Sequence, residues 1–205
     1  VKDLLERNDL PTVDVLDGSP PCFVAGTQVL TKEGYKSIED IQIGDYVWTH
    51  KGRFRRVHAT MNKQSDDVYS VDIQGSLPIL VTGNHPFYTR EMPRLKKQGE
   101  PLWKEVKDLG KIKGQDYIGI PVVDSAEIEV VPPSHLHICI DNCLWVPFKG
   151  KEKLDGNYTV YNISVEDDES YTVNNIAVHN CSTFSLAGSR EKAWGVEKKF
   201  REGQA

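Results

Sequence analysis

The chain has 205 residues, 39% of them hydrophobic and 27% charged, which is enough for one ordinary domain with a hydrophobic core. Its net charge of −5 gives no overall positive field that would attract nucleic acid, and we interpret the local Lys and Arg clusters as solvated surface. No apolar run approaches the roughly 18 residues of a membrane span, and no signal sequence opens the chain. We therefore expect a cytoplasmic protein whose four cysteines are reduced thiols.

The predicted elements divide the chain into three parts. Because the chain starts at Val1, we expect a fragment or processed form; its first part has a helical pattern at 1–7 and a strand pattern at 12–16. From 22 to 180 the sequence changes to short runs of β-branched and aromatic residues separated by turn residues, which is typical of an all-β domain. A helical pattern returns at 189–200.

Within the middle part we expect many short strands and little helix. The predicted strands are 27–31, 45–50, 54–61, 68–73, 79–82, 117–121, 127–131, 143–148, 158–165 and 170–173. Tight turns are predicted at Lys51-Gly52 and Gln74-Gly75, and single helical turns at 37–41 and 102–109.

Two distant segments read as one loop once the residues between them are removed. Pro21 lies directly before Cys22, and Cys181 lies directly after Asn180, so the joined string would be Gly-Ser-Pro-Pro-Cys-Ser-Thr-Phe-Ser. The removed segment begins with a cysteine, ends in His179-Asn180 and is followed by a second cysteine. This is the chemistry needed to cut a chain twice and rejoin its ends.

Each of these residues fits one step of such a reaction. The thiolate of Cys22 is a strong nucleophile that can attack the Pro21 carbonyl and convert an amide into a thioester. Cys181 can then take over the acyl group. Asn180 can break the bond after itself by attacking its own carbonyl to form a succinimide, with His179 polarising that carbonyl. A shift of the acyl group from sulfur to nitrogen would restore a peptide bond between Pro21 and Cys181.

A second polar group can assist the first cut. The leaving nitrogen must gain a proton and the developing oxyanion must be held by donors. Thr82, Asn84 and His85 lie at the end of an apolar run that can hold them rigidly. We therefore predict that they act at the bond before Cys22.

With these residues in view, segment 22–180 resembles an intein that carries no homing endonuclease. The strings that carry the resemblance are 22–31, 82–85, 103–121, 160–166 and 176–180. The resemblance implies the horseshoe-shaped, all-β Hedgehog/intein (HINT) fold, which brings both splice junctions to one site. It also implies three regions: an N-extein fragment at 1–21, the intein at 22–180 and a C-extein fragment at 181–205. No cofactor is implied, and the protein would act on its own flanks.

Three positions depart from what the family or the chemistry favours. Asn162 stands where the family often has Asp, so a neutral hydrogen-bonding group replaces an ionisable one. Glu169 stands where many members have a histidine that assists asparagine cyclisation. We assign both supporting roles. The ring of Pro21 crowds the carbonyl that Cys22 must attack, so we expect a slow first step that Pro21→Gly accelerates.

The flanks resemble a different family. Residues 13–21 joined to 181–190 are similar to the catalytic motif of cytosine-5 DNA methyltransferases, in which the cysteine after Pro-Pro attacks a flipped cytosine. The resemblance implies that Cys181 serves the host enzyme after splicing, and that the spliced host binds DNA and S-adenosylmethionine. Splicing itself would need no nucleic acid. No Gly-rich S-adenosylmethionine loop is present, so the fragment alone is not expected to methylate DNA.

Some alternatives remain open at this point. His135, His137, Cys139 and Cys143 are metal-capable but match no zinc signature, so we expect no metal. The chain could cleave itself without ligation, or it could be an inert metal-binding or DNA-binding insert in a methyltransferase. Oxidation could also link Cys22 to Cys181 and arrest splicing, since both must meet at one site.

Overall fold

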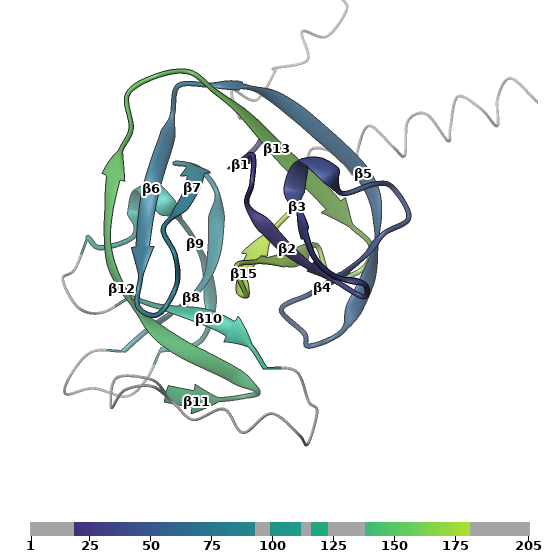
Figure 1. Ribbon diagram of the computed structural model, residues 1–205. Helices are drawn as coiled ribbons and strands as arrows, with labels where there is room; N and C mark the ends of the chain where they lie inside the picture. The colour runs from purple at the N-terminus through teal and green to yellow at the C-terminus, as the bar shows by residue number, and fades with distance from the viewer. Residues whose placement is uncertain (1–18, 93–98, 112–115, 123–137, 181–205) are drawn as a thin grey trace, which may run out of the picture.

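The computed structural model describes residues 19–92, 99–111, 116–122 and 138–180. In this part of the chain, fifteen strands are joined by backbone hydrogen bonds into one sheet (Figure 1). The strands are β1 (Phe23–Val24), β2 (Gln28–Thr31), β3 (Gly34–Ser37), β4 (Tyr46–Trp48), β5 (Phe54–Ser65), β6 (Val68–Ile73), β7 (Ile79–Thr82), β8 (Pro86–Glu91), β9 (Leu102–Glu105), β10 (Asp116–Pro121), β11 (Ile138–Ile140), β12 (Cys143–Lys153), β13 (Tyr158–Val165), β14 (Ser170–Val173) and β15 (Ile176–His179). Two 3-10 turns, η1 (Ile38–Asp40) and η2 (Val106–Asp108), are the helical elements of the described residues. The all-β fold predicted from the sequence is confirmed in these residues.

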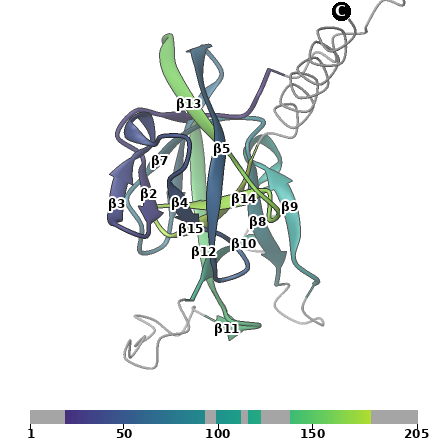
Figure 2. The same ribbon diagram turned by 90° about the vertical axis from the view of Figure 1, so that its right-hand side faces the viewer.

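The sheet closes on itself. Along the hydrogen-bonded path the strands run β10, β12, β6, β7, β1, β13, β5, β4, β2, β14, β15, β8 and β9, with β3 on β2 and β11 on β12. Strand β8 also pairs with β10, which closes the path into a ring and leaves β9 attached to β8 outside it. The long strands β5, β12 and β13 run along the outside of the molecule, while the short strands β1 and β15 lie inside (Figure 1). Figure 2 shows β14 crossing the middle of the molecule.

Most elements lie where the sequence predicts them. Strands β6, β7, β13 and β14 have the predicted bounds, η1 and η2 lie within the predicted helical turns, and β5 and β12 run further than predicted. The helical prediction over 102–109 is wrong in its first half, because Leu102–Glu105 pairs with β8 as strand β9. The patterns at 1–7, 12–16, 127–131 and 189–200 lie outside the described residues.

Asparagine and aspartate form two of the two-residue hairpin turns. Asn174 and Asn175 join β14 to β15 with φ of 46° and 69°, and Asp141 and Asn142 join β11 to β12 with φ of 55° each. Two successive residues with positive φ form the turn whose twist matches paired strands, and Asn and Asp tolerate it well. The first of these hairpins positions the residues that lead to Asn180.

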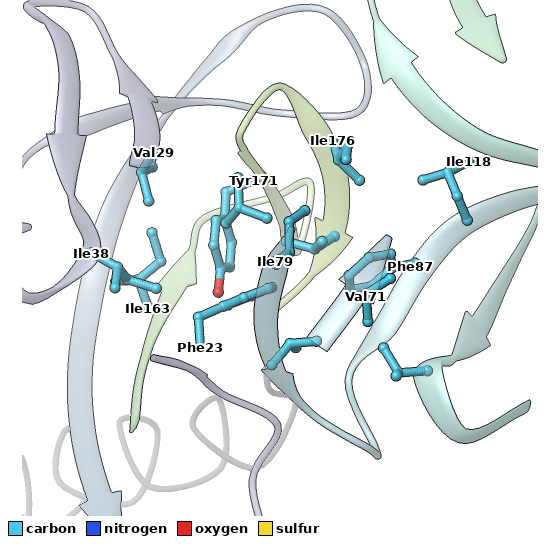
Figure 3. Close-up of a cluster of buried hydrophobic side chains, with 14 of the residues drawn as sticks. Phe23, Val29, Ile38, Val71, Ile79, Phe87, Ile118, Ile163, Tyr171 and Ile176 are labelled. Atoms are coloured by element: carbon cyan, nitrogen blue, oxygen red, sulfur yellow. The ribbon is translucent and has the colours of Figure 1, made fainter. Parts of the chain in front are cut away.

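The core contains the residue that follows Cys22. Phe23 is fully buried, with its ring centroid 6.4 Å from that of Phe87 and 6.2 Å from that of Tyr171 (Figure 3). Burial of an aromatic side chain contributes roughly 1.5–3 kcal/mol, so Phe23 anchors the start of β1 firmly.

Among the residues that the structure describes, the helical elements are single turns, and none could cross a bilayer.

Candidate functional site

The peptide between Pro21 and Cys22 is held at the start of an interior strand. Phe23 pairs with Tyr161 of β13 on one side and with Val81 of β7 on the other. Cys22 is fully buried, and its thiol lies 3.3 Å from the Pro20 carbonyl oxygen, to which it donates. The first candidate scissile bond is therefore fixed by strands on both sides.

Thr82, at the end of β7, binds the backbone of Cys22 twice. Its Oγ1 accepts the Cys22 amide N–H at 2.8 Å, and its own N–H donates to the Cys22 carbonyl at 2.9 Å. The Thr82 hydroxyl donates in turn to Asn84 Oδ1 at 2.9 Å, and Asn84 Nδ2 donates to the Ser19 carbonyl. Together with Lys63, which donates to the Ser19 hydroxyl, these contacts hold the segment upstream of Cys22.

The carbonyl of Pro21 is bound by Asn162. Asn162 lies in β13 and is 2% exposed, and its Nδ2 donates to the Pro21 oxygen at 2.6 Å. Its Oδ1 accepts the Tyr171 hydroxyl and the Ile163 N–H, each at 2.7 Å. The residue that departs from the family pattern thus contacts the carbonyl that Cys22 would attack.

His85 lies against the core next to this junction. Its backbone N–H donates to the Thr82 carbonyl, and its ring centroid is 4.2 Å from that of Phe23. Burial, together with the nearby His179 ring, lowers the pKa of His85 to about 3. The His179 backbone opposes this shift, although its geometry falls short of a hydrogen bond to either ring nitrogen. His85 is therefore neutral at physiological pH.

A second set of contacts surrounds Asn180, directly after β15. Its N–H donates to the Glu169 carbonyl at 2.9 Å, and its Nδ2 donates to the Val165 carbonyl at 3.3 Å. His179 Nδ1 lies 2.7 Å from the Asn180 carbonyl oxygen. Since a carbonyl only accepts, Nδ1 carries the proton in this contact. The Glu169 carboxylate is 3.9 Å from His179 Nε2.

The two sets of residues adjoin. Strand β15 pairs with β8 through Val178 and Phe87, and β8 follows His85 directly. The effect of His179 on the pKa of His85 reflects the same proximity. The structure thus brings the predicted residues of both cuts into one region, whereas Cys181 lies outside the described residues.

Three residues that the sequence did not single out contact this region. Tyr171 supports Asn162, and the Trp103 ring lies between those of His50 and His179, at centroid distances of 5.3 and 5.0 Å. His50 Nδ1 contacts the Ser170 hydroxyl at 2.6 Å. No sequence signal marked these contacts, because each joins residues that are far apart in the chain or on different strands.

The metal-capable residues give no cluster in the part that is described. Cys139 is exposed on β11, and Cys143 is buried in β12, where burial raises its pKa to about 12. His135 and His137 lie outside the described residues. Among the residues described, no three His, Cys, Asp or Glu side chains are grouped as metal ligands would be.

Comparisons with known proteins agree with this geometry. Residues 21–88 match the model of the Hint domain, and no curated protein sequence matches the chain at a significant level. The gp41-1 intein is similar in structure, with a TM-score of 0.55 and 20% identity over 79% of this chain and all of its own. A bacterial intein-like domain from Clostridium thermocellum has a TM-score of 0.54 and a sequence identity of 28%. The match covers 79% of this chain and all of that domain. A DnaB intein from Synechocystis sp. PCC 6803 has a TM-score of 0.57 and a sequence identity of 15%. The match covers 78% of this chain and 98% of that intein. Residues 21–88 are therefore similar to a Hint domain, and the described residues have the all-β HINT fold that the sequence predicts, which is also the fold of these inteins.

Proposed function

We propose that residues 22–180 excise themselves by protein splicing and join Pro21 to Cys181. One observation carries this proposal above the others. The carbonyls of both bonds that must break, those of Pro21 and Asn180, are each bound by a polar side chain, Asn162 and His179 respectively. Such contacts polarise a carbonyl for nucleophilic attack.

The first step converts an amide into a thioester. The Cys22 sulfur attacks the Pro21 carbonyl carbon, the bond from that carbon to the Cys22 nitrogen breaks, and the thiol proton passes to the nitrogen. His85, whose ring lies against Phe23 beside this junction, can deliver the proton to the nitrogen, because a low pKa makes its protonated form a good acid. Thr82, which binds the Cys22 N–H, holds the leaving nitrogen in place.

The later steps move the acyl group and free the middle segment. The Cys181 thiolate attacks the thioester and releases the Cys22 thiol. Asn180 Nδ2 then attacks its own carbonyl carbon, which breaks the bond to Cys181 and leaves a succinimide. The freed Cys181 amine attacks the new thioester and restores a peptide bond, so no water is consumed.

Mass spectrometry of the freshly expressed chain over time tests the proposal. We expect the 23.1 kDa precursor to give free 22–180 and a ligated product of 1–21 and 181–205. Cys22→Ala should block the thioester, and Asn180→Ala should block the second cut. Ligated flanks from both variants would refute the proposal. Separate flanks would indicate cleavage without ligation, and an intact precursor would indicate an inert insert.

We also propose that the flanks belong to a cytosine-5 DNA methyltransferase. Its support is the joined string Pro20-Pro21-Cys181 with its neighbours. Because the interruption lies directly before Cys181, the host should be inactive until splicing is complete. A precursor carrying the complete host chain should methylate cytosine, in the presence of DNA and S-adenosylmethionine, only after the ligated mass appears. Equal methylation by the Asn180→Ala precursor would contradict this.

A further inference from the structure

The hydrogen bonds around Asn162 fix which way its amide points. Its Oδ1 accepts two groups that can donate, the Ile163 N–H and the Tyr171 hydroxyl, each at 2.7 Å. A flipped amide would face NH₂ to the Ile163 N–H and oxygen to the Pro21 oxygen, which would lose both contacts. The Nδ2 group is therefore directed at Pro21, where it donates at 2.6 Å.

The surroundings of Asn162 also hold it rigidly. Asn162 lies in β13, which is hydrogen-bonded to β1 on one side and to β5 on the other. Tyr171 is fully buried in β14, with its ring 6.2 Å from that of Phe23 (Figure 3). The donor and the carbonyl it binds are thus positioned by the same core, and neither needs to move before the reaction.

We propose that Asn162 is a catalytic residue whose Nδ2–H stabilises the oxyanion formed on Pro21, and that Tyr171 is the positioning residue that aims it. This inference rests on the splicing proposed above and adds a residue to its first step. When the Cys22 sulfur bonds to the Pro21 carbon, the electron pair of the C=O bond moves to oxygen. A hydrogen bond to that charged oxygen is stronger than the same bond to a carbonyl, so the contact lowers the barrier. Collapse of the oxyanion returns the pair and expels the Cys22 nitrogen, which receives a proton.

An amide and a carboxyl group at this position would behave differently with pH. Asparagine donates at every pH, whereas aspartate donates only when protonated. In Asn162→Asp, an ionised carboxylate would place a bare oxygen against the Pro21 oxygen and repel the oxyanion. The titratable groups near this position include the Tyr171 hydroxyl, the Cys22 thiol and the His85 ring, which lies against Phe23, whereas Met61, opposite on β5, is uncharged.

The test isolates the first step in the full chain with Asn180→Ala and Cys181→Ala, so that the thioester accumulates and a small thiol can cleave it. The measurement is the rate of thiol-induced cleavage after Pro21 from pH 5 to 9. With Asn162 present, the rate should rise with pH as the Cys22 thiol ionises. Asn162→Ala should be about 100-fold slower at every pH, as expected for loss of one oxyanion donor.

Two further variants separate catalysis from folding. Asn162→Asp has almost the same shape and should react near the original rate at low pH, then slow as its carboxyl ionises, so its pH profile slopes the opposite way. Tyr171→Phe should be about three- to tenfold slower with an unchanged profile. Asn62→Ala, a change at an exposed asparagine of neighbouring strand β5, is the matched control and should have no effect.

The outcomes distinguish this inference from the proposed function. An Asn162→Ala rate within twofold of the parent, or an Asn162→Asp profile that rises like the parent, would overturn the oxyanion role. If the chain that retains Asn162 gave no thiol-cleavable product, the proposed splicing itself would be overturned. Cleavage after Asn180 in a Cys22→Ala background reports that each variant has folded, because that cut does not use the Pro21 carbonyl.

Discussion

The His85 imidazole is both the proton carrier of the proposed first step and a buried group that must stay neutral in the folded chain. Burial lowers its pKa to about 3, whereas an exposed histidine titrates near 6.5. Between these values the unfolded chain binds a proton that the folded chain does not. The contribution of neutral His85 to folding stability is therefore complete above about pH 6.5, and it is lost as the pH falls toward 3.

We predict that His85 alone removes about 2 kcal/mol of folding stability between pH 7 and pH 5. Urea unfolding of the Cys22→Ala, Asn180→Ala precursor at both pH values would measure it. His85→Gln should reduce this loss, while part remains because burial also lowers the pKa of His50 to about 4. A His85→Gln chain with the same pH dependence as its parent would contradict the prediction.

The turn between β13 and β14 connects a cluster of charges to Asn180, the residue of the proposed second cut. Asp168 accepts from Thr49 Oγ1 and from Arg53 Nε at 2.8 Å each, and it pairs with Lys51 at 3.2 Å. These cations hold the pKa of Asp168 well below its usual range, with Arg53 as the main cause. The next residue, Glu169, has a φ of 49° and accepts the Asn180 N–H. Asp168 thus fastens the turn that positions Asn180.

We predict that Asp168→Asn costs about 2 kcal/mol of stability, because half-exposed Lys51 and Arg53 lose their partner but remain partly solvated. It should also slow cleavage after Asn180 in a Cys22→Ala background. Asp167→Asn changes an exposed carboxylate in the same turn and should cost less than about 0.5 kcal/mol. Denaturant midpoints of the two variants compare them directly, and equal midpoints would show that the cluster does not fasten the turn.

The closed path of the sheet depends on a close approach at β10. This strand pairs with both β8 and β12, and a Cβ at Gly119 would lie 2.8 Å from Tyr88 Cδ1 and 3.0 Å from Cys143 Sγ. Such distances require packed side chains to shift. Glycine is needed here for space, since Gly119 does not have a positive φ.

At the scale of the whole molecule, Gly119→Ala should lower stability by about 1–3 kcal/mol, as overpacking does in other cores. Gly150→Ala in β12 is the matched control, because a Cβ there meets nothing within 4 Å. It should be neutral or slightly stabilising. Thermal unfolding of both variants in the splicing-blocked precursor gives the comparison, and an equal change in Tm would refute the role of Gly119 in closure.

The strands were predictable where local pattern and tertiary pairing agree. Runs of β-branched residues gave the bounds of β6, β7, β13 and β14, because such side chains fit a pleated, half-buried surface. Six strands were missed, namely β1, β3, β8, β9, β11 and β15. All but β8 have only two to four residues, and all six are defined by their partners rather than by an alternating pattern. Leu102–Glu105 shows this best, since its helical appearance is overridden by pairing with β8.

The sequence by itself determined the residue types and their order: a cysteine at the start of the segment, His-Asn at its end, and a Thr-Gly-Asn-His string between them. These follow from covalent chemistry, which depends on side-chain identity and on adjacency along the chain. Only the tertiary structure decided that Asn162 binds the Pro21 carbonyl, that Tyr171 fixes its orientation, and that His85 is too buried to be charged. The physical reason is that hydrogen-bond direction and desolvation depend on which strands are packed together, and β1, β13 and β14 are brought together by pairing and core packing across more than 130 residues of chain.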